Sequence, residues 1–243
     1  MTTATIFATR LKEKEHVAEG TMAFHLAKPD GFQFKAGQYL DITLVNPPET
    51  DAEGNIRSLS IASAPEDQDL LVATRMRDSA FKRVLGKAGP ELEIKIEGPT
   101  GSFILHNNSS KAAVFLAGGI GITPFSSMVR HAARARLPHR LYLFYSNRRP
   151  EDAAFMNVLR QLERENANYK FIPTMTEMNK SRQTWDGEVG FINRDMLLSH
   201  LPGLQGPIFY IAGPPAMVAA MRAMLTGAGV DEDDIRTEEF AGY

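Results

Sequence analysis

Residues 116–125 read LAGGIGITPF, an apolar run that breaks into three glycines within four positions and then meets Thr-Pro. The overlapping apolar run at residues 113–117, AVFLA, is typical of a buried strand in a parallel sheet. The stretch that follows has the chemistry of a helix start, with Thr123 suited to cap and Pro124 to the first turn. The glycines are therefore predicted to lie between a strand and a helix.

A glycine-rich turn at this place is suited to an anion. The free N–H groups and the dipole at a helix start favour a negative group such as a pyrophosphate, and glycine lets that group come close. The spacing is G-G-x-G, which differs from the G-x-G-x-x-G of the commonest dinucleotide fingerprint. The motif alone also fits a tight turn in which glycine serves the geometry only.

Composition and charge exclude several classes of protein. The length of 243 residues fits two small domains or one large one, and the net charge of −2 argues against wholesale nucleic-acid binding. No apolar run approaches the roughly 18 residues of a membrane span, and the N-terminus lacks a secretory signal, so a cytoplasmic location is expected. The absence of cysteine excludes disulfides, thiol catalysis and a cysteine-bound iron–sulfur cluster. The six histidines show no metal-binding spacing, so no metal site is predicted.

The hydrophobic period changes along the chain. From residue 1 to about 105 it alternates in short runs such as LEIKIEG at residues 92–98, which predicts an antiparallel six-stranded β-barrel with a short helix beginning at Ser79. After a linker at 106–111, strands alternate with helices, which predicts an α/β doubly wound parallel sheet. Helices are expected after its first, second and fourth strands. The expected domains are residues 1–107 and 108–243.

Six short motifs occur in order along these two halves. They are RSLSIAS (57–63), GPTGSF (98–103), GGIGITP (118–124), YSNRRPEDAAF (145–155), AGPPAM (212–217) and the ending EEFAGY. Together with the barrel and the doubly wound domain, they resemble the ferredoxin-NADP reductase family of flavoproteins over essentially the whole chain. The resemblance implies FAD in the first domain, a nicotinamide dinucleotide in the second, and hydride transfer from the nicotinamide to flavin N5.

The resemblance assigns flavin contacts to the RSLS stretch. It places Arg57 on a flavin phosphate, Leu59 against the isoalloxazine ring and Ser60 near N5. A guanidinium fork matches phosphate oxygens, and a hydroxyl can adapt when N5 gains a proton. Leu59 stands where the family has an aromatic residue, so ring stacking is lost. The expected flavin contacts are Arg57, Ser58, Leu59, Ser60, Arg77 and Ser79.

The stretch MRDS at residues 76–79 departs from the family pattern G-x-x-S/T, which opens the helix that cradles FAD phosphates. Ser79 matches the pattern, whereas Met76 replaces the glycine. Asp78 brings a negative charge near the pyrophosphate unless it points away as a helix cap, and Arg77 and Lys82 offset that charge.

The second domain carries the expected nicotinamide contacts. The loop after Tyr145 offers Arg148 or Arg149 to a 2'-phosphate, and no carboxylate precedes Glu151 to hold the adenine ribose of NADH. We therefore predict NADP, with NAD as the alternative; a solvated basic loop is the explanation without a ligand. The expected contacts are Gly118, Gly119, Gly121, Thr123, Ser146, Arg148, Arg149 and Gly213.

The expected catalytic set is small because hydride transfer needs no general base. It contains Ser60 and an aromatic residue that covers the flavin, which plant-type relatives supply at the C-terminus. Matching strand ends puts Phe240 there, and Tyr243 is the alternative because Gly242 lets the chain fold back. Both aromatics packing between the domains is the remaining possibility.

The acceptor of the electrons is expected to be a separate carrier protein, ferredoxin or flavodoxin. The basic stretch RHAARARLPHR at residues 130–140 suits an acidic carrier, although a solvated helix face is the simpler explanation. One alternative is a reductase of small acceptors such as free flavin, quinones or ferric chelates, and another is a flavin-binding regulatory module with slow turnover. The choice of FAD over FMN and the oligomeric state stay open.

Overall fold

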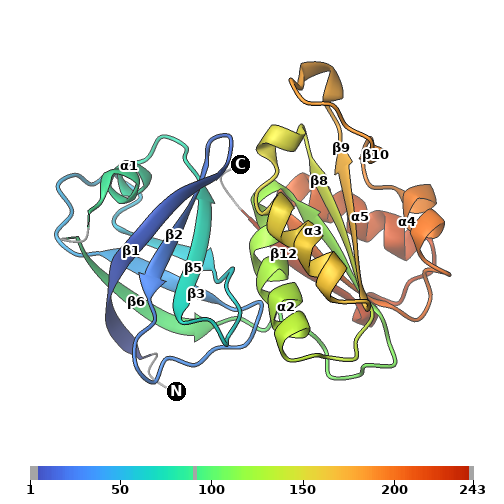
Figure 1. The fold of residues 1–243 in the computed structure, drawn as a ribbon, viewed down its shortest axis with the longest axis horizontal. Helices are drawn as coiled ribbons and strands as arrows, with labels where there is room; N and C mark the ends of the chain where they lie inside the picture. Colours follow the sequence, from blue (N-terminus) through green and yellow to red (C-terminus); the bar gives the residue numbers. More distant parts are fainter. Residues whose placement is uncertain (1–4, 90–91, 241–243) are drawn as a thin grey trace.

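The computed structural model describes residues 5–89 and 92–240, which form two lobes side by side (Figure 1). Each lobe is built on a six-stranded sheet, antiparallel in the first and parallel in the second. The fold class predicted from the sequence is thereby confirmed. The predicted division after residue 107 falls in the segment that links the sheets, and it stays a prediction.

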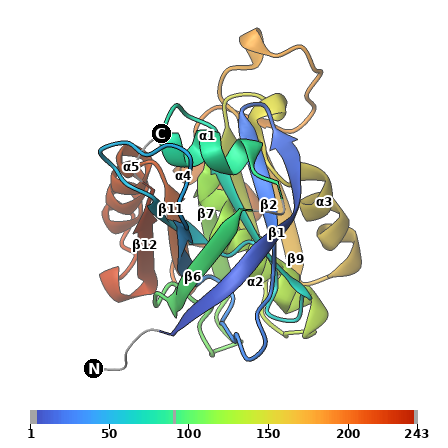
Figure 2. The ribbon, with the colours of Figure 1, turned by 90° about the vertical axis from the view of Figure 1, so that its left-hand side faces the viewer.

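The first lobe is a closed sheet with the strand order β4-β3-β6-β1-β2-β5. A bridge between Ile61 and Val72 joins its two edges, just after β4 and within β5. Alternation explains the inner face, since Ile94 and Ile96 of β6 are buried between exposed neighbours. The single described helix of this lobe, α1, lies at its upper end in Figure 2. The elements are β1 (Ile6–Ala18), β2 (Thr21–Ala27), β3 (Tyr39–Leu44), β4 (Ile56–Ser60), β5 (Asp69–Arg75), α1 (Ala80–Lys87) and β6 (Glu93–Thr100).

The second lobe is a parallel sheet with helices on both faces, in the order β10-β9-β8-β7-β11-β12. Its central strand packs both ways because Phe115 faces α2 and α3, whereas Val114 and Leu116 face α4 and α5. The strands are β7 (Ala113–Gly118), β8 (Leu141–Asn147), β9 (Tyr169–Met175), β10 (Glu188–Val189), β11 (Ile208–Gly213) and β12 (Ile235–Glu239). The helices are α2 (Ile122–Arg134), α3 (Met156–Glu165), α4 (Arg194–His200) and α5 (Pro215–Gly227).

The structure corrects the expected start of α2. The helix begins at Ile122 because Gly121 already adopts helical dihedral angles and takes the capping position. Thr123 therefore lies inside the first turn, and its hydroxyl donates to the Ile120 carbonyl at 3.0 Å instead of capping. The predicted helix pattern was also incomplete, because the short α4 follows the third long strand.

The start of α1 corrects a second expectation. Ser79 is the cap, and its hydroxyl oxygen accepts from the Lys82 backbone N–H at 3.4 Å. Asp78 does not cap the helix; its carboxylate pairs with Arg83 on the surface.

The two lobes are fixed to each other near the end of β4. The Ser126 hydroxyl of α2 donates to the Ala62 carbonyl at 3.1 Å, and the Ser127 hydroxyl donates to the Ser63 carbonyl at 2.6 Å. Further along α2, the basic stretch pairs His131 with Glu66 and Arg134 with Asp67. These basic side chains thus bind the chain's own first lobe.

Candidate functional site

The glycine-rich turn lies at the point where the chain reverses its path across the sheet. The chain runs from β7 through β8 to β9 on one side and returns to β11 on the other side of β7, which is where open α/β sheets bind ligands. A Cβ atom at Gly118 would lie 2.4 Å from Met217 Sδ, and one at Gly121 would lie 2.3 Å from the Ala212 carbonyl oxygen. Close packing of the turn against the end of β11 therefore requires Gly121, whereas a side chain at Gly118 would meet Pro214 and the movable side chain of Met217 at the start of α5.

Two further glycines complete this turn. Gly119 begins a single 3₁₀ turn, η1 (Gly119–Gly121), with φ of +51°, a left-handed conformation that favours glycine. A Cβ atom at Gly213 would lie 3.1 Å from the Gly118 backbone nitrogen, so the ends of β7 and β11 touch through their backbones. Ser146 stands beside Gly118 in the neighbouring strand β8.

A cavity of about 690 Å³ lies between the lobes and collects residues from both. It is formed by β4, the end of β5, the start of α1, η1 and the end of β12. It thereby brings together seven residues that the sequence predicted to act with flavin. They are Arg57, Ser58, Leu59, Ser60, Arg77, Ser79 and Phe240.

Basic side chains gather at the α1 end of this cavity. Arg57, Arg75, Arg77 and Lys82 all line it. The pKa of Lys82 is lowered, first by burial and then by repulsion from Arg77 and Arg57. A buried lysine that is repelled by two arginines gains most from an added anion, so this end of the cavity is suited to negatively charged groups.

The Arg57 guanidinium is held in place by several groups. It lies 2.6 Å from the Glu53 carboxylate, donates to the Glu53 and Ile56 carbonyls, and stacks over the Phe81 ring with 5.3 Å to its centroid. Sequence reasoning missed the carboxylate, although Glu53 lies only four residues away. Arg57 is thus oriented, but its charge already has an acidic partner.

Glu238 of β12 is a cavity residue that the sequence analysis did not single out. Burial raises its pKa to about 7, and its Oε2 atom is buried without a hydrogen-bond partner. It lines the same cavity as the buried Ser60 and the half-buried Phe240. Period-2 alternation along IRTEEF was the available signal, because it sets Glu238 on the opposite face of the strand from Glu239.

The end of β12 positions the aromatic candidate. The Phe240 backbone N–H donates to the Gly213 carbonyl at 3.0 Å, which ties the chain end to the glycine-rich turn. Tyr243 lies outside the described residues.

The two candidate arginines after β8 differ sharply. The Arg149 guanidinium bonds both oxygens of Asp152, at 3.0 and 2.7 Å, and lies 3.1 Å from the Glu19 carboxylate. These acids raise the pKa of Arg149. Arg148 is exposed, and within residues 5–89 and 92–240 it has no salt-bridge partner.

Within residues 5–89 and 92–240, no helix combines the length and the apolar character of a membrane span. In the same residues, no three or more histidine, aspartate or glutamate side chains are grouped so that they could hold a metal ion.

Comparisons with known proteins agree with this geometry. Residues 115–223 match the family model described as the oxidoreductase NAD-binding domain. The chain is 28% identical to ferredoxin–NADP reductase B of Sorangium cellulosum, covering 90% of each protein. It is 26% identical to NADH-cytochrome b5 reductase 1 of Cryptococcus neoformans, covering 90% of this chain and 78% of that one. It also covers 63% of the reductase component of propane 2-monooxygenase from Rhodococcus jostii, at 26% identity.

Solved structures share the fold over almost the whole chain. The FAD/NAD-binding domain of nitric oxide dioxygenase from Vibrio cholerae superposes with a TM-score of 0.83 at 19% identity, covering 96% of this chain and 98% of that one. A ferredoxin-NADP⁺ reductase from Neisseria gonorrhoeae, with FAD and NADP bound, superposes with a TM-score of 0.78 at 20% identity over the same shares.

The two sheets, the cavity between them and the glycine-rich turn define a nicotinamide-dependent flavoprotein oxidoreductase. Over most of its length the chain is similar to reductases of the ferredoxin-NADP reductase type, and its residues 115–223 match an oxidoreductase NAD-binding domain.

Proposed function

We propose that this protein takes electrons from NADPH through an FAD held between its lobes and passes them to a separate electron-carrier protein, ferredoxin or flavodoxin. One observation carries the proposal. A single cavity joins the RSLS stretch and the start of α1 to the glycine-rich turn and the end of β12.

The residues of the cavity fit FAD in their chemistry. Its basic end and the N–H groups of α1 match a pyrophosphate, and Leu59 and Phe240 supply apolar surface for a ring. When bound, FAD accepts a hydride and releases its two electrons one at a time.

The chain's own residues then have distinct tasks. Arg57, Arg77 and Ser79 bind the phosphates, and Leu59 supports the ring. Ser60, which is 5% exposed, offers a hydroxyl shielded from water. Glu238, which lines the same cavity, exchanges a proton near neutral pH, because burial raises its pKa to about 7.

An aromatic residue covers the ring until the nicotinamide arrives. Phe240 is the first candidate, because its backbone is tied to Gly213 at the glycine-rich turn. Tyr243 is the second. The test compares Phe240→Ala with a chain that ends at Phe240. A charge-transfer band with NADP⁺ that appears only in Phe240→Ala supports Phe240 as the residue that covers the ring, and a band that appears only in the shortened chain supports Tyr243. If neither protein shows the band, the proposal that an aromatic residue covers the ring is contradicted.

NADPH is the proposed donor because Arg148 is exposed just after β8, near Ser146, and forms no salt bridge among the described residues, although Glu177 lies close enough to interact with its charge. A 2'-phosphate supplies a direct partner for its guanidinium. Arg149 is assigned a structural task instead, since Asp152 and Glu19 already occupy its donors.

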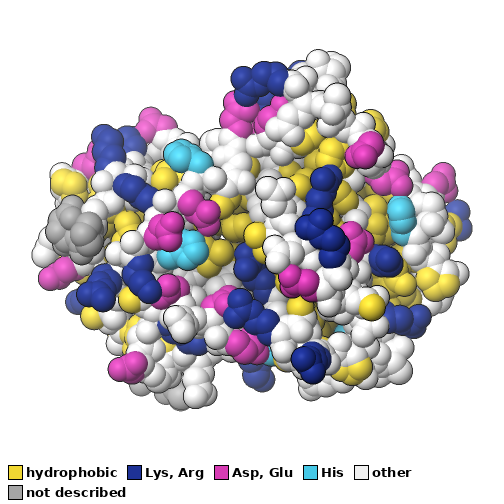
Figure 3. All heavy atoms as spheres, viewed as in Figure 1, with side chains coloured by type: hydrophobic (Ala, Val, Ile, Leu, Met, Phe, Trp, Pro, Cys, Tyr) yellow, Lys and Arg dark blue, Asp and Glu magenta, His cyan; other side chains and the backbone are white. Residues whose placement is uncertain are grey.

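On the face seen in Figure 3, basic and acidic side chains are interspersed. This face therefore presents no single basic patch on which the carrier could dock. The names of the relatives given above indicate different electron partners, so the identity of the carrier is a proposal. Steady-state assays with ferredoxin, flavodoxin, quinone, free flavin and ferric chelate will rank the acceptors. A preference for a small acceptor by kcat/KM would favour the alternative function.

The decisive experiment is anaerobic addition of NADPH to the FAD-loaded protein while absorbance near 450 nm is followed. Rapid bleaching requires both cofactor sites to work together. Loaded protein that bleaches only over many minutes would instead support the slow regulatory module.

A further inference from the structure

The loop between β3 and β4 carries three carboxylates toward the basic end of the cavity. We call residues 49–53 the acid loop; it contains Glu49, Asp51 and Glu53. The acid loop precedes Arg57 in sequence and lies against the start of α1, and those two elements are the proposed phosphate-binding groups.

Asp51 bridges the two phosphate-binding elements. Its Oδ2 atom accepts from the Ala80 backbone N–H, the first of α1, at 2.6 Å, and its Oδ1 atom lies 3.9 Å from the Arg57 guanidinium. The hydrogen bond from Ala80 is the main cause of the lowered pKa of Asp51, so this carboxylate stays ionised at neutral pH. A carboxylate between a guanidinium and a helix start occupies the position that a phosphate would take.

Glu53 occupies the remaining face of the same arginine. Its carboxylate lies 2.6 Å from the Arg57 guanidinium, whose side chain is 19% exposed. Glu53 itself is 71% exposed, so it can move into solvent at little cost, whereas Arg57 is held by the Phe81 ring and backbone carbonyls.

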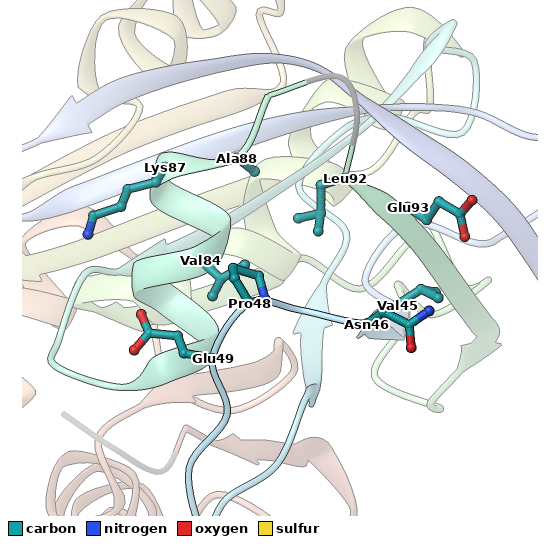
Figure 4. A pocket seen from close by; sticks show the side chains of 9 residues that line it. All are labelled: Val45, Asn46, Pro48, Glu49, Val84, Lys87, Ala88, Leu92 and Glu93. Carbon is teal, nitrogen blue, oxygen red and sulfur yellow. The ribbon is translucent and has the colours of Figure 1, made fainter.

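None of the five acid-loop residues is buried. Figure 4 shows a cavity of about 690 Å³ at the edge of this loop, lined by Pro48 and Glu49 on one side and by Val84 and Lys87 of α1 on the other. Polar contacts hold the loop instead, such as the 2.9 Å pair between Glu49 and Arg83. Surface ion pairs of this kind contribute little stability, so the loop can leave the helix.

We propose that the acid loop is an internal competitor for the flavin phosphates: Asp51 and Glu53 occupy the start of α1 and Arg57, and they must leave before a phosphorylated flavin binds. This inference rests on the proposed function. The loop thereby controls cofactor loading, because the protein without flavin satisfies its own phosphate-binding groups. It also offsets part of the repulsion among the basic side chains of the cavity, because Glu53 interacts with both Arg57 and Lys82.

The test measures flavin affinity rather than turnover. Asp51→Asn and Glu53→Gln each remove a competing charge, and the amide of the first still accepts from Ala80. Glu93→Gln is the control, because Glu93 is a carboxylate of the same lobe on the far side of the Figure 4 cavity from α1. Dissociation constants are measured by flavin fluorescence quenching for FAD, FMN and riboflavin.

We expect both acid-loop variants to bind FAD about tenfold more tightly than the wild type, and FMN to follow FAD. Riboflavin, which has no phosphate, should bind equally to all proteins, and Glu93→Gln should match the wild type. FAD affinity that is unchanged or weaker in both acid-loop variants would overturn the competitor role and make the carboxylates supports of Arg57. If none of the proteins binds any flavin, the proposed function fails as well, and the two failures are distinguished.

Discussion

The two anion-binding regions proposed here use arginine in opposite ways. In the cavity between the lobes, Arg57 is surrounded by Glu53 and Asp51, which belong to the same lobe. Just after β8, Arg148 forms no salt bridge among the described residues and interacts with Glu177 only at longer range, whereas its neighbour Arg149 is held by Asp152 and Glu19. An arginine in a motif therefore identifies a ligand site only once its own partners are known.

Because of this difference, the two regions gain different amounts of binding free energy from a phosphate. A phosphate at Arg148 adds a direct ion pair where the chain makes only a longer-range contact with Glu177. A phosphate at Arg57 replaces one that the chain already makes, so its net gain is smaller than its contacts suggest.

The largest expected effect tests the flavin side of this comparison. Arg57→Ala should weaken FAD binding about 100-fold, because the variant loses a fixed, charge-assisted donor pair. Riboflavin binding should change far less. Isothermal titration with both ligands measures this, with Arg10→Ala as a control that removes an exposed arginine of the same lobe outside the cavity. Equal losses for FAD and riboflavin would mean that Arg57 supports the fold and not the phosphate.

The nucleotide side gives the next effect. Arg148→Ala should lower kcat/KM for NADPH about tenfold and leave NADH unchanged, because the guanidinium meets only the 2'-phosphate. Arg149→Ala is the matched control; it should keep the ratio of the two cofactors and lower the melting temperature, since Asp152 loses its bidentate partner. If Arg149→Ala changes the ratio and Arg148→Ala does not, the two assignments are reversed.

A smaller effect separates the ring from the phosphates. Leu59→Tyr should raise FAD affinity by about 2- to 12-fold, because stacking contributes roughly 0.5 to 1.5 kcal/mol beyond burial. Riboflavin should gain by the same factor. Flavin content after gel filtration reports the change, and unchanged or lower content counts against lost stacking at this position.

The smallest effect concerns Glu238, a cavity acid whose Oε2 atom has no hydrogen-bond partner, in contrast to Asp51 and Glu53. Its pKa is raised by burial from 4.5 to about 7, so the folded protein retains a proton that the unfolded chain loses. Its contribution to the free energy of unfolding is therefore complete below about pH 4.5 and is lost as pH rises through about 7. Melting temperatures of the flavin-free protein from pH 5 to 8 should fall less in Glu238→Gln. Melting temperatures that fall by the same amount in both proteins would show that burial does not raise the pKa of Glu238.

Local patterns predicted the fold class and named seven of the residues that line the cavity, because alternation, glycine spacing and strand ends depend on neighbouring residues. The residue roles within that cavity stay predictions. The acid loop was not predicted, since the bond from Ala80 to Asp51 joins segments 29 residues apart and depends on the path of the loop.

Three local errors have physical reasons. Ser79 and Asp78 have equal capping chemistry, and the pairing of Asp78 with Arg83 leaves the cap to Ser79. Thr123 was displaced because glycine adopts the capping position without a side chain. The helix α4 was missed because it is seven residues long and buries only Met196 and Leu197.

The two serine contacts between α2 and the chain leaving β4 set a mechanical limit on the molecule. Ser126 and Ser127 hold the carbonyls of Ala62 and Ser63, which follow Ser60 directly. These two hydrogen bonds connect the segment that follows Ser60 to the helix that begins at the glycine-rich turn. Rotation of one lobe against the other would have to break both of them. A change of access to the cavity that keeps both hydrogen bonds is therefore confined to its edges, such as the one where Glu53 of the acid loop lies.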